Sequence, residues 1–547
     1  MWQNALVRKR WIHCRAPLSF EKGWFALRQH TVCLCSVTWY FVLCYKSITP
    51  ITKRARVEVY QRKTLQTRSL FPACSRHRLQ EVFPGEGGVM AMLVKPLSGW
   101  GRYPVYSCEL ERPERYADLR SDAASVIARG QGRSYGDAAL NENRRVLLTE
   151  RVNRLLEFNV ANGILRAEAG VTLAEIIDVI VPIGWFLPVT PGTKFVSLGG
   201  CVAADVHGKN HHHEGSFGDH VLSMELILAD GSRVVCSPSE NSGLFWATVG
   251  GMGLTGTIGE VTIKLIPIQS ALMKVRHNAA VNLDRLFRLM QDPDLDDRYT
   301  VAWIDSLSSG KDLGRGILMC GHHAAAEEVP DDLHGSIKPA RSRSIPFDFP
   351  AWALNPLSIS AFNSRYYKKE SGRRFPFLSS YDSYFYPLDA IAAWNRMYGK
   401  RGFVQYQCVI PDASSFEAIH KLLEELSNSR RPSFLAVLKR LGPQGRGLLS
   451  FPVAGYTLAL DLPIRDNSLF ELLNKLDEIV LRRGGRVYLA KDARLSAESF
   501  RAMYPRYTEW LKIKNAVDPQ NKFSSSLSRR LGIGEAKESI NVYGIEK

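Results

Sequence analysis

The sequence predicts an α+β protein with two domains. Its 547 residues exceed what one hydrophobic core normally serves, so at least two domains are expected. Residues 100–268 mix alternating, strand-like segments with a helix, whereas residues 403–490 follow the order β-α-β-β-α-β. Because that order is typical of a ferredoxin-like unit, we expect an α+β first domain and a ferredoxin-like second domain.

The first domain opens with short strands. Strands are expected at 146–149 and 155–159, and we interpret them as part of a small β-meander. Asn162-Gly163 follows the second of these strands, and this dipeptide best fits a tight type I′ hairpin turn. The chain is therefore expected to reverse its direction at this point.

A helix and a second hairpin complete the first domain. Thr172 and Glu175 have the spacing of a capping box, apolar residues then recur at helical spacing, and Gly184 ends the helix. Asp230-Gly231 separates two apolar segments as a hairpin turn would, and residues 256–266 alternate again. These patterns indicate an α+β unit.

The second domain has its own set of predicted elements. They are strands at 403–410, 434–438, 456–462 and 486–490, and helices at 414–426 and 468–483. Ser468 and Glu471 have the spacing of a capping box at the second helix. Residues 267–402 have a less regular pattern and are rich in aromatic residues around 366–386, so we expect them to form the wall of a cavity.

The first 89 residues differ from the rest of the chain. They hold 15 Lys and Arg against four acidic residues and so carry +11 of the total net charge of +17. The remainder has no motif that interleaves basic and aromatic residues, which argues against nucleic-acid binding. We expect residues 1–89 to be a basic extension outside the fold. Three interpretations of these residues are open: translated upstream sequence before a start at Met90 or Met92, a targeting or membrane-surface segment, or a separate domain.

Cysteine and hydropathy patterns limit the cellular location. The ten cysteines include no CxxC pair, which argues against a zinc site and against a dense disulfide framework. The apolar run at 31–45 is shorter than the roughly 20 residues of a spanning helix, and no span is expected after Met90. We expect a protein that is cytoplasmic or peripheral at the inner membrane, with the periplasmic face still open.

Three glycine-rich segments suit close contact between backbone and a ligand. They lie at 129–137, 191–200 and 250–256, and together they favour one extended cofactor groove. Gly251-Met-Gly253-Leu-Thr-Gly256 matches the letters of the GxGxxG dinucleotide motif, but a strand-like segment follows where that motif needs a helix. A Rossmann NAD site is therefore disfavoured.

A histidine cluster at 207 and 211–213 lies beside this bare backbone. Three interpretations are open, namely a metal site, polar contacts to a cofactor or substrate, and structural histidines. Apart from Asp205 and Glu214 no acidic or thiol ligand has zinc spacing, and the neighbouring glycines would hold metal ligands loosely. Contacts to a cofactor or substrate are favoured, and no metal is expected.

Together, segments 129–137, 191–200, 206–220 and 245–256 resemble the flavin-binding half of the vanillyl-alcohol-oxidase type of FAD oxidoreductases. Within that type the chain most resembles the decaprenylphosphoryl-β-D-ribose oxidases, over about residues 100–531. Further segments that carry the resemblance are Gln405-Tyr-Gln407, Leu449-Ser-Phe-Pro452, Tyr488-Leu-Ala-Lys491-Asp492, Val517-Asp-Pro519 and Ser528-Arg-Arg530.

The resemblance implies a specific division into domains. The substrate-binding domain would interrupt the FAD-binding domain and form a roof over the flavin. The expected boundaries are 90–268 for the first part of the FAD-binding domain, 269–485 for the substrate-binding domain, 486–531 for the returning FAD-binding segment and 532–547 for a tail.

The resemblance also implies FAD as cofactor. In many relatives a histidine in the first glycine loop binds the flavin covalently, but Arg133 occupies that place here, so non-covalent FAD is expected. The cofactor-binding residues carried over are Arg129, Gly130, Gly132, Arg133, Ser134, Tyr135, Gly136, Gly192, Thr193, Gly199, Gly200, Cys201, Ala204, His207, Gly208, Asn210, Gly256, Ile258 and Tyr488.

The implied reaction oxidises the ribose 2′-hydroxyl of a polyprenyl-phosphate-linked sugar to a ketone. It is the first half of an epimerisation to arabinose for cell-envelope polysaccharide, completed by a separate NAD(P)H-dependent short-chain reductase. Lys491, Tyr135 and His207 are the expected catalytic residues; Lys491 supplies positive charge, and Tyr135 and Lys491 are the candidate bases. The expected substrate-binding residues are Lys209, Trp303, Tyr367, Gln405, Gln407, Lys439, Ala459 and Lys491.

One departure from the resemblance concerns Ala459, which stands where mycobacterial relatives carry a pocket cysteine. Covalent inhibitors aimed at that thiol should not react here. Two alternatives remain open, an FAD oxidase of a free sugar, alditol or aldonolactone, and a non-catalytic flavoprotein. For Lys491 the alternative is a lysine on an exposed strand end. Contact with a membrane surface is expected only through the lipid tail of the substrate.

Overall fold

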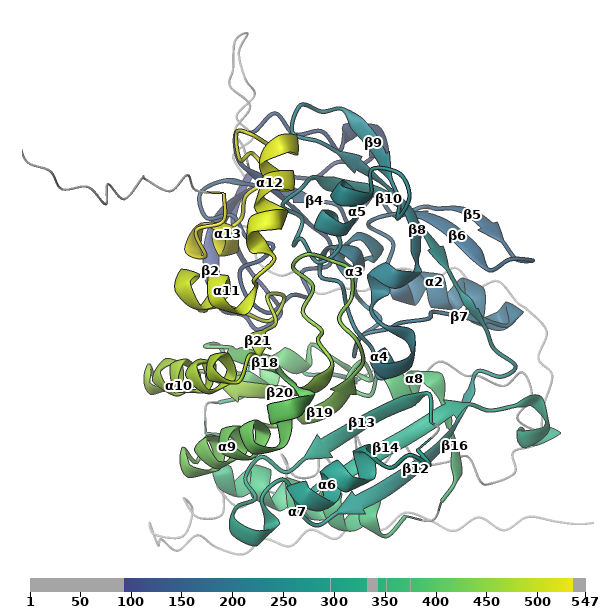
Figure 1. Ribbon diagram of the computed structural model, residues 1–547, viewed down its shortest axis with the longest axis vertical. Coiled ribbons are helices and arrows are strands. Elements are labelled where there is room, and N and C mark those ends of the chain that lie inside the picture. Colours follow the sequence, from purple (N-terminus) through teal and green to yellow (C-terminus); the bar gives the residue numbers. More distant parts are fainter. Residues whose placement is uncertain (1–92, 296, 332–342, 351, 374, 535–547) are drawn as a thin grey trace, which may run out of the picture. The chain divides into compact units, whose positions relative to one another are not determined.

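The computed structural model describes residues 93–295, 297–331, 343–350, 352–373 and 375–534. The extension predicted at 1–89 lies outside the described residues, as does the end of the chain from residue 535. Figure 1 shows the helices and strands in the order of the chain, from blue strands through the green sheet to yellow helices.

Two sheets form the first part of the described chain. A four-stranded sheet has the order β1-β2-β4-β3, and a five-stranded antiparallel sheet has the order β5-β6-β10-β8-β9. Their strands are β1 (Leu93–Ser98), β2 (Val105–Glu111), β3 (Val126–Arg129), β4 (Arg145–Leu148), β5 (Leu155–Asn159), β6 (Ile164–Glu168), β8 (Val221–Ile227), β9 (Arg233–Cys236) and β10 (Thr257–Lys264).

The helices of this part are short, and the longest is capped as predicted. In α2 (Leu173–Ile180) the Thr172 hydroxyl accepts from the Glu175 amide, which confirms the capping box, and Gly184 adopts a left-handed conformation just beyond the helix. The other helices are α3 (Leu198–Ala203), α4 (His211–Glu214) and α5 (Ser242–Thr248). Helix α5 precedes and strand β10 follows the GxGxxG letters, so the helix that a Rossmann motif needs is not at that place.

Two details of the predicted strands are wrong. The strands expected as a meander lie in different sheets, because β4 pairs in parallel with β2 and β3 whereas β5 pairs with β6. The hairpin at Asn162-Gly163 exists, but Asn159 pairs with Ile164, so four residues rather than two form its loop. The sequence therefore predicted the position of the turn correctly, but not which residues of β5 and β6 pair beside it.

An eight-stranded sheet dominates the second part, in the order β16-β12-β14-β13-β19-β20-β18-β21. Along the chain, its last four strands occur with helices α9 (Ser415–Asn428) and α10 (Ser468–Arg482) in the order β18-α9-β19-β20-α10-β21. If these strands are numbered 1 to 4 along the chain, their order in the sheet is 2-3-1-4, which is that of a ferredoxin-like sheet. The prediction of this unit is confirmed. The strands are β12 (Leu272–Ala280), β13 (Tyr299–Ile304), β14 (Gly316–His323), β16 (Phe377–Ser380), β18 (Phe403–Pro411), β19 (Ala436–Leu441), β20 (Gly455–Pro463) and β21 (Arg486–Val487).

The irregular stretch before residue 402 supplies the other half of this sheet. Strands β12, β13, β14 and β16 extend it beyond β19, with helix α6 (Leu283–Met290) between β12 and β13. Helices α7 (Pro356–Ser371) and α8 (Tyr381–Phe385) account for the aromatic-rich stretch. Two-stranded pairs β7 (Trp185–Phe186) with β11 (Ile266–Pro267) and β15 (Arg343–Ser344) with β17 (Ile391–Ala392) complete the strands of the described chain.

Two predicted features of the ferredoxin-like unit need correction. Helix α10 begins at Ser468, whose hydroxyl donates to Asp466 Oδ1 at 2.7 Å, so the predicted capping box of Ser468 with Glu471 does not form. The strand expected at 486–490 ends at Val487, because the chain turns there and the Lys491 amide donates to the Tyr488 carbonyl oxygen at 2.9 Å.

The end of the described chain returns to the first two sheets. Helices α11 (Ala497–Met503), α12 (Tyr507–Val517) and α13 (Ser526–Arg530), yellow in Figure 1, lie beside the blue elements. The indole of Trp510 donates to the Ala247 carbonyl oxygen at 2.8 Å, and the Ser524 amide donates to Val126 O at 3.1 Å. These contacts are what a returning segment requires.

Candidate functional site

The two faces of the eight-stranded sheet differ in chemistry. On β18 the side chains of Val404, Tyr406 and Cys408 belong to the apolar core, whereas Gln405 and Gln407 point to the opposite face because strand side chains alternate. Helices α6 and α9 lie below the sheet in Figure 1, and α4 and α8 lie above it. We call the side of Gln405 and Gln407 the polar face.

The register of the sheet assembles more polar residues on that face. Gln405 pairs with Asp461, Gln407 pairs with Ala459, and Thr457 pairs with Lys439. Paired residues of neighbouring strands project to the same side. Four of the predicted substrate-binding residues, Gln405, Gln407, Lys439 and Ala459, therefore share one face with an aspartate that sequence reasoning missed.

Asp461 is fully buried, and its carboxylate is hydrogen-bonded. Gln405 Nε2 donates to Asp461 Oδ1 at 2.5 Å and the Tyr398 hydroxyl donates to Oδ2 at 3.4 Å. Burial raises the pKa of Asp461 to about 7, although the Gln405 hydrogen bond and the charge of Lys491 oppose the shift. The sequence signal for this residue was an acidic side chain at an alternate position between Leu460 and Leu462 of an apolar strand.

His207 reaches the polar face from the first part of the chain. Its Nε2 lies 2.9 Å from Gln407 Nε2. An amide nitrogen is only a donor, so Nε2 must accept and the neutral ring carries its proton on Nδ1, which has no hydrogen-bond partner among the described residues. Burial, and then the charge of Lys439, hold the pKa of His207 well below its usual range. A neutral imidazole with a free N–H therefore lies at this junction.

Lys491 and Tyr135 form the second junction between the two parts. The Lys491 ammonium lies 3.9 Å from the centre of the Tyr135 ring, and the Tyr135 amide donates to the Ala490 carbonyl oxygen at 3.0 Å. Lys491 is partly buried on the turn after β21, not on an exposed strand end. Burial lowers its pKa to about 7, the carboxylate of Asp461 raises it, and Lys439 lowers it.

The phenol of Tyr135 is a weaker acid than that of an ordinary tyrosine. Burial raises the pKa of this phenol well above its usual range, and the charge of Asp461 acts in the same direction. Of the two candidate bases, only Lys491 therefore has a pKa near neutrality.

Two further lysines bring positive charge to the same region. Burial lowers the pKa of Lys439 to about 8, and burial together with the charge of Lys439 lowers the pKa of Lys209 to about 7. The Lys209 ammonium donates to the Tyr384 carbonyl oxygen and lies 4.5 Å from the centre of the Tyr384 ring. Lys209 therefore contacts helix α8.

The predicted cofactor-binding glycines fall into two groups. A Cβ at Gly136 would lie 1.7 Å from Asp492 O, one at Gly130 would lie 2.1 Å from Ser197 Oγ, and one at Gly199 would lie 2.8 Å from the Ala169 Cβ. These glycines are needed for contacts within the protein. A Cβ at Gly200 would also lie close to a protein atom, 2.9 Å from Ser197 Oγ, whereas one at Gly192 would meet nothing within 4 Å. Gly192 therefore leaves backbone bare for a ligand.

Other glycines of this set are constrained by conformation or by neighbouring side chains. Gly132 has φ +60°, and Gly256 has φ +159° with Ile227 O only 3.0 Å from a Cβ placed there. A Cβ at Gly208 would lie 2.6 Å from Asn210 Oδ1. Their role in cofactor binding stays a prediction.

Several of the predicted cofactor-binding side chains donate hydrogen bonds to backbone carbonyl oxygens of the protein. Arg129 donates to Ser98 O at 2.7 Å, Asn210 Nδ2 donates to Pro188 O at 2.7 Å, and the Tyr488 hydroxyl donates to Ala204 O at 2.8 Å. Of the other members, the Ser134 carbonyl oxygen accepts from the Trp100 amide and the Thr193 hydroxyl accepts from the Phe195 amide, while Cys201 of α3 and Ile258 of β10 are buried in the core.

Two buried polar atoms of these loops keep their capacity for hydrogen bonds. Asn210 Oδ1 and Arg133 Nε have no partner among the described residues. The Arg133 guanidinium lies 4.0 Å from the centre of the Trp100 ring. A bound polar molecule could supply hydrogen-bond partners to these two atoms and to His207 Nδ1.

Trp303 and Tyr367, two further predicted substrate-binding residues, lie on strand β13 and helix α7. Trp303 pairs with Val437 on the polar face and contacts the ring of Tyr366 at 4.6 Å. The ring of Tyr367, the next residue of α7, lies under the Arg315 guanidinium at 5.0 Å. The structure thus places Tyr366 rather than Tyr367 against Trp303.

The histidine cluster disperses into separate environments. His211 accepts at Nδ1 from the Gly442 amide at 2.9 Å and lies 3.2 Å from Ser216 Oγ through Nε2, while His212 and His213 contact each other at 4.3 Å. Within the described ranges, no three His, Cys, Asp or Glu side chains are placed to share a metal ion.

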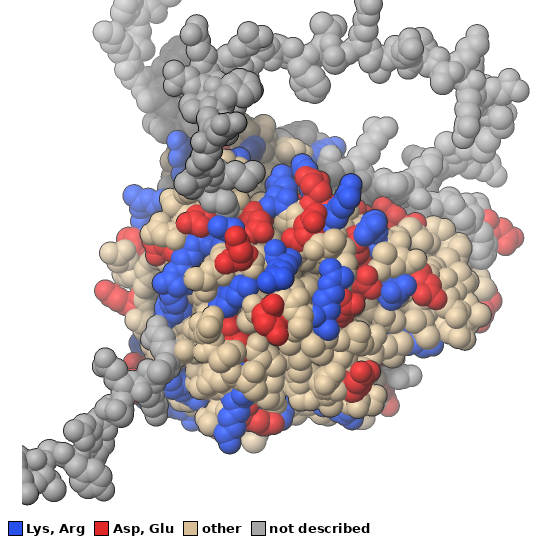
Figure 2. Space-filling view, turned by 90° about the horizontal axis from the view of Figure 1, so that it is seen from above, with Lys and Arg blue, Asp and Glu red and all other residues tan. Residues whose placement is uncertain are grey.

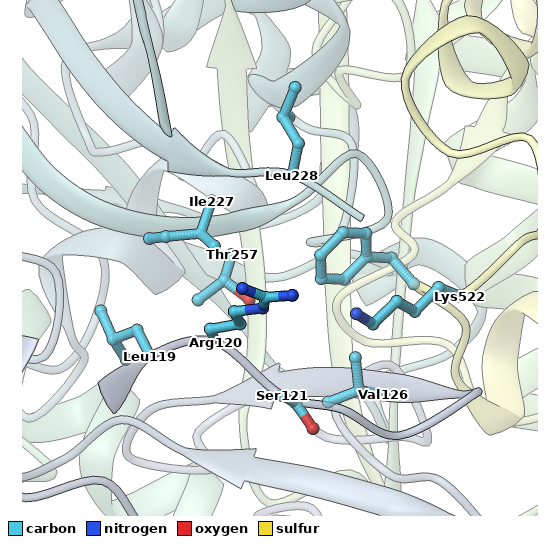
Figure 3. A pocket seen from close by; sticks show the side chains of 9 residues that line it. Leu119, Arg120, Ser121, Val126, Ile227, Leu228, Thr257 and Lys522 are labelled. Atoms are coloured by element: carbon cyan, nitrogen blue, oxygen red, sulfur yellow. The ribbon is translucent and has the colours of Figure 1, made fainter. Parts of the chain in front are cut away.

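A small cavity of about 10 Å³ lies elsewhere, between β3, β8, β10 and the returning segment (Figure 3). That volume suits about one water molecule. Its lining residues are Leu119, Arg120, Ser121, Val126, Ile227, Leu228, Thr257, Lys522 and Phe523. It contains none of the predicted site residues and is not the site described above.

Surface charge and helix hydropathy were compared with what nucleic-acid binding and membrane insertion require. Figure 2 shows Lys and Arg interspersed with Asp and Glu on the face seen from above, rather than gathered in a basic stripe. A search for membrane spans, confined to the described residues, finds no helix with the length and apolar character that crossing would need.

Comparisons with known proteins give matches over most of the chain. A family model described as an FAD binding domain matches residues 114–237, and one described as D-arabinono-1,4-lactone oxidase matches residues 462–531. Decaprenylphosphoryl-β-D-ribose oxidase of Mycolicibacterium smegmatis is 37% identical over 450 residues, which are 80% of this chain and 97% of that protein. An uncharacterised protein of Streptomyces coelicolor is 35% identical over 66% of this chain and its own full length.

One solved structure is similar in fold. Physcomitrella patens BBE-like 1 superposes with a TM-score of 0.56 and 14% sequence identity, over 77% of this chain and 90% of that chain. At this identity the likeness concerns the fold alone.

Proposed function

The chain belongs to the decaprenylphosphoryl-β-D-ribose oxidase family, and from this premise we propose that it oxidises the ribose 2′-hydroxyl of a polyprenyl-phosphate-linked ribose to the ketone. It is an FAD-dependent oxidoreductase that acts on a CH–OH group. The observation that carries the proposal is the junction at which Gln407 and Asp461 of the polar face approach His207 and Lys491.

The residues present fit FAD. The bare backbone at Gly192 and the unpaired atoms Arg133 Nε, Asn210 Oδ1 and His207 Nδ1 offer a surface with hydrogen-bonding capacity. These residues would hold the cofactor, which when bound supplies the acceptor for the substrate hydride. The Arg133 side chain offers no nucleophilic imidazole for a covalent link, so we propose non-covalent FAD that denaturation releases into solution.

Lys491 is the residue that we assign to the hydroxyl proton. Near neutral pH a pKa of about 7 leaves part of Lys491 as a neutral amine that can accept this proton. Accepting it creates an ammonium ion at the same place, where positive charge stabilises negative charge that develops during oxidation. Tyr135, whose pKa lies well above its usual range, acts as a hydrogen-bond donor instead.

The remaining polar residues would position the substrate. Lys439 carries positive charge near the phosphodiester of the substrate, and Gln405 and Gln407 are held in place by Asp461 and His207. Fixed orientation of the reacting C–H is a large part of the rate enhancement in such reactions.

The wider setting of the reaction is also proposed. The ketone is the first product of a two-step epimerisation to arabinose for cell-envelope polysaccharide, so a separate NAD(P)H-dependent reductase must consume it. The lipid tail of the substrate would place the protein at a membrane surface, at the inner membrane. We propose residues 90–268 and 486–531 as the FAD-binding domain and 269–485 as the substrate-binding domain.

Anaerobic titration followed by flavin absorbance tests the proposal. Polyprenylphosphoryl ribose should bleach the bound flavin, whereas a free alditol or aldonolactone should leave the spectrum unchanged at the same concentration. Bleaching by the free sugars but not by the lipid-linked ribose would overturn it.

A further inference from the structure

Three large apolar side chains stand in solvent just before and at the start of helix α7. Phe347 is 62% exposed, Trp352 49% and Leu357 83%. Asn355 caps the helix, since its Oδ1 accepts from the Leu357 amide at 2.9 Å while its Nδ2 donates to Trp352 O at 2.9 Å. The backbone groups of Trp352 and Leu357 are therefore both bound by the side chain of Asn355.

The segment that carries these side chains is tied to the body of the protein. Arg396 donates to the carbonyl oxygens of Ile345 and Pro346 at 3.1 and 3.0 Å, and Arg102 pairs with Asp348 at 2.6 Å. A further bond runs from Arg465 to Leu354 O. Single exposed apolar residues are ordinary, but Phe, Trp and Leu exposed together on an anchored segment indicate a contact surface.

Positive charge accompanies the apolar side chains. Residues 343–373 contain five Lys and Arg and two acidic residues, and both acids have basic partners within the protein. Asp348 pairs with Arg102, and Glu370 is fully buried against His277. Arg365 and Lys368 are exposed on α7. The outer side of this segment is thus both apolar and basic.

The inner side of α7 borders the site. Tyr366 contacts Trp303 of the polar face at 4.6 Å, and the ring of Phe362 lies 5.3 Å from that of Phe434, just before β19. One helix therefore presents aromatic rings to the substrate-binding sheet and an apolar, basic surface to solvent.

We propose that this outer surface docks the protein on an anionic lipid bilayer. The docking face, as we define it, consists of Phe347, Trp352, Leu357, Arg365 and Lys368. Trp, Phe and Leu side chains enter the boundary between headgroups and acyl chains, and Lys and Arg bind anionic headgroups. The inference rests on the proposed function, because a lipid-linked substrate resides in such a bilayer and would reach the site past α7.

Co-sedimentation of the full-length holoenzyme with vesicles tests the docking face. Vesicles of phosphatidylcholine containing phosphatidylglycerol should bind the wild type, and added salt should weaken binding, because exposed charges are screened. The triple variant Phe347→Ser, Trp352→Ser, Leu357→Ser and the double variant Arg365→Glu, Lys368→Glu should each bind about tenfold less. The matched control Val160→Ser, Val235→Ser changes exposed apolar residues of the first domain and should bind like the wild type.

Turnover adds a readout that separates this inference from the proposed function. Both variants should oxidise a soluble, short-chain phosphoryl ribose at the wild-type rate and lose about tenfold on long-chain substrate embedded in vesicles. Failure of the wild type to oxidise any ribose while still binding vesicles would overturn the proposed function alone. Wild type that stays in the supernatant with anionic vesicles, or variants that sediment like it, would overturn the docking face. A dimer in light scattering that the triple variant abolishes would overturn it too, since the face would then join two copies of this chain.

Discussion

The two faces of the eight-stranded sheet are formed by the same strands but differ in their surroundings. One face packs into the hydrophobic core, and the other carries the polar residues of the candidate site. On β20, Leu458 and Leu460 belong to the same hydrophobic core as residues of helices α6, α9 and α10, while Ala459 and Asp461 point to the polar face. Period-two alternation produces this difference, so neighbouring residues of one strand separate stability from chemistry.

The buried polar groups of the polar face are paired, some within the sheet and some across the junction with the first part of the chain. Gln405 donates to Asp461, and Gln407 donates to His207 of the first part of the chain. Unpaired, each buried amide or carboxylate would cost about 1–3 kcal/mol. The comparison of the two faces therefore predicts that substitutions on the polar face affect catalysis, whereas substitutions on the opposite face affect folding.

The largest expected effect is that of Lys491→Ala. Loss of the amine that accepts the hydroxyl proton should lower the rate of flavin reduction by about 10²–10⁴-fold. Stopped-flow absorbance after mixing with lipid-linked ribose measures the rate, and retained flavin shows that the site still forms. Lys475→Ala, which removes an exposed lysine paired with Glu425, is the matched control and should keep the wild-type rate. An unchanged rate in Lys491→Ala would contradict the assignment.

Leu458→Ala probes the opposite face. Deleting a fully buried leucine should lower the free energy of unfolding by about 2–5 kcal/mol, because a cavity remains in the core. Urea denaturation measures this loss, and turnover per folded molecule should stay unchanged. The adjacent Ala459→Cys on the polar face should alter stability by no more than about 0.5 kcal/mol. Equal losses in the two variants would remove the distinction between the faces.

Asp461→Asn changes the pH dependence rather than the fold. The Asp461 carboxylate raises the pKa of Lys491, so its removal should lower that pKa below about 7. If neutral Lys491 is the base, activity rises as pH increases through this pKa, and the midpoint of the rise should move to lower pH. The pH profile of kcat/KM checks the direction. A midpoint displaced upward would be inconsistent with the pairing, and the exposed Asp466→Asn serves as control.

Gly192→Ala is expected to have the smallest effect and extends the comparison to the glycine loops. A Cβ there meets no protein atom within 4 Å, so stability without FAD should be unchanged. If FAD lies against this backbone, its dissociation constant should rise about tenfold, as overpacking costs on the order of 1–3 kcal/mol. Fluorescence titration with FAD measures it. Gly136→Ala, whose Cβ would overlap Asp492 O, should instead destabilise the protein itself.

Local patterns predicted the elements that depend on neighbouring residues. The capping box at Thr172, the hairpin at Asp230-Gly231 and the β-α-β-β-α-β order after residue 402 all form. In contrast, the capping box at Ser468 failed because Asp466 binds that hydroxyl, and the long strand ending at Ala490 failed because the chain turns before Lys491. Both failures depend on single contacts that compete with a local preference.

The candidate site divides in the same way. Gln405, Gln407, Lys439 and Lys491 were predicted as site residues from motifs, and their roles stay predictions. Asp461 was not predicted, because only the pairing of β20 with β18 brings it beside Gln405. Likewise, the letters Gly130, Gly136 and Gly192 are equivalent in the sequence. Only the contacts around each position separate glycines that protein packing requires from one that leaves room for a ligand.

The sequence by itself determined the family, the cofactor class and the alternation of polar and apolar residues along β18 and β20, because these depend on residue types at short spacing. The tertiary structure alone decided which partners those residues meet. It brings His207 to Gln407 across 200 positions and Lys491 onto Tyr135, and the resulting burial lowers the pKa of Lys491 to about 7. Desolvation and long-range pairing arise only when distant segments pack together.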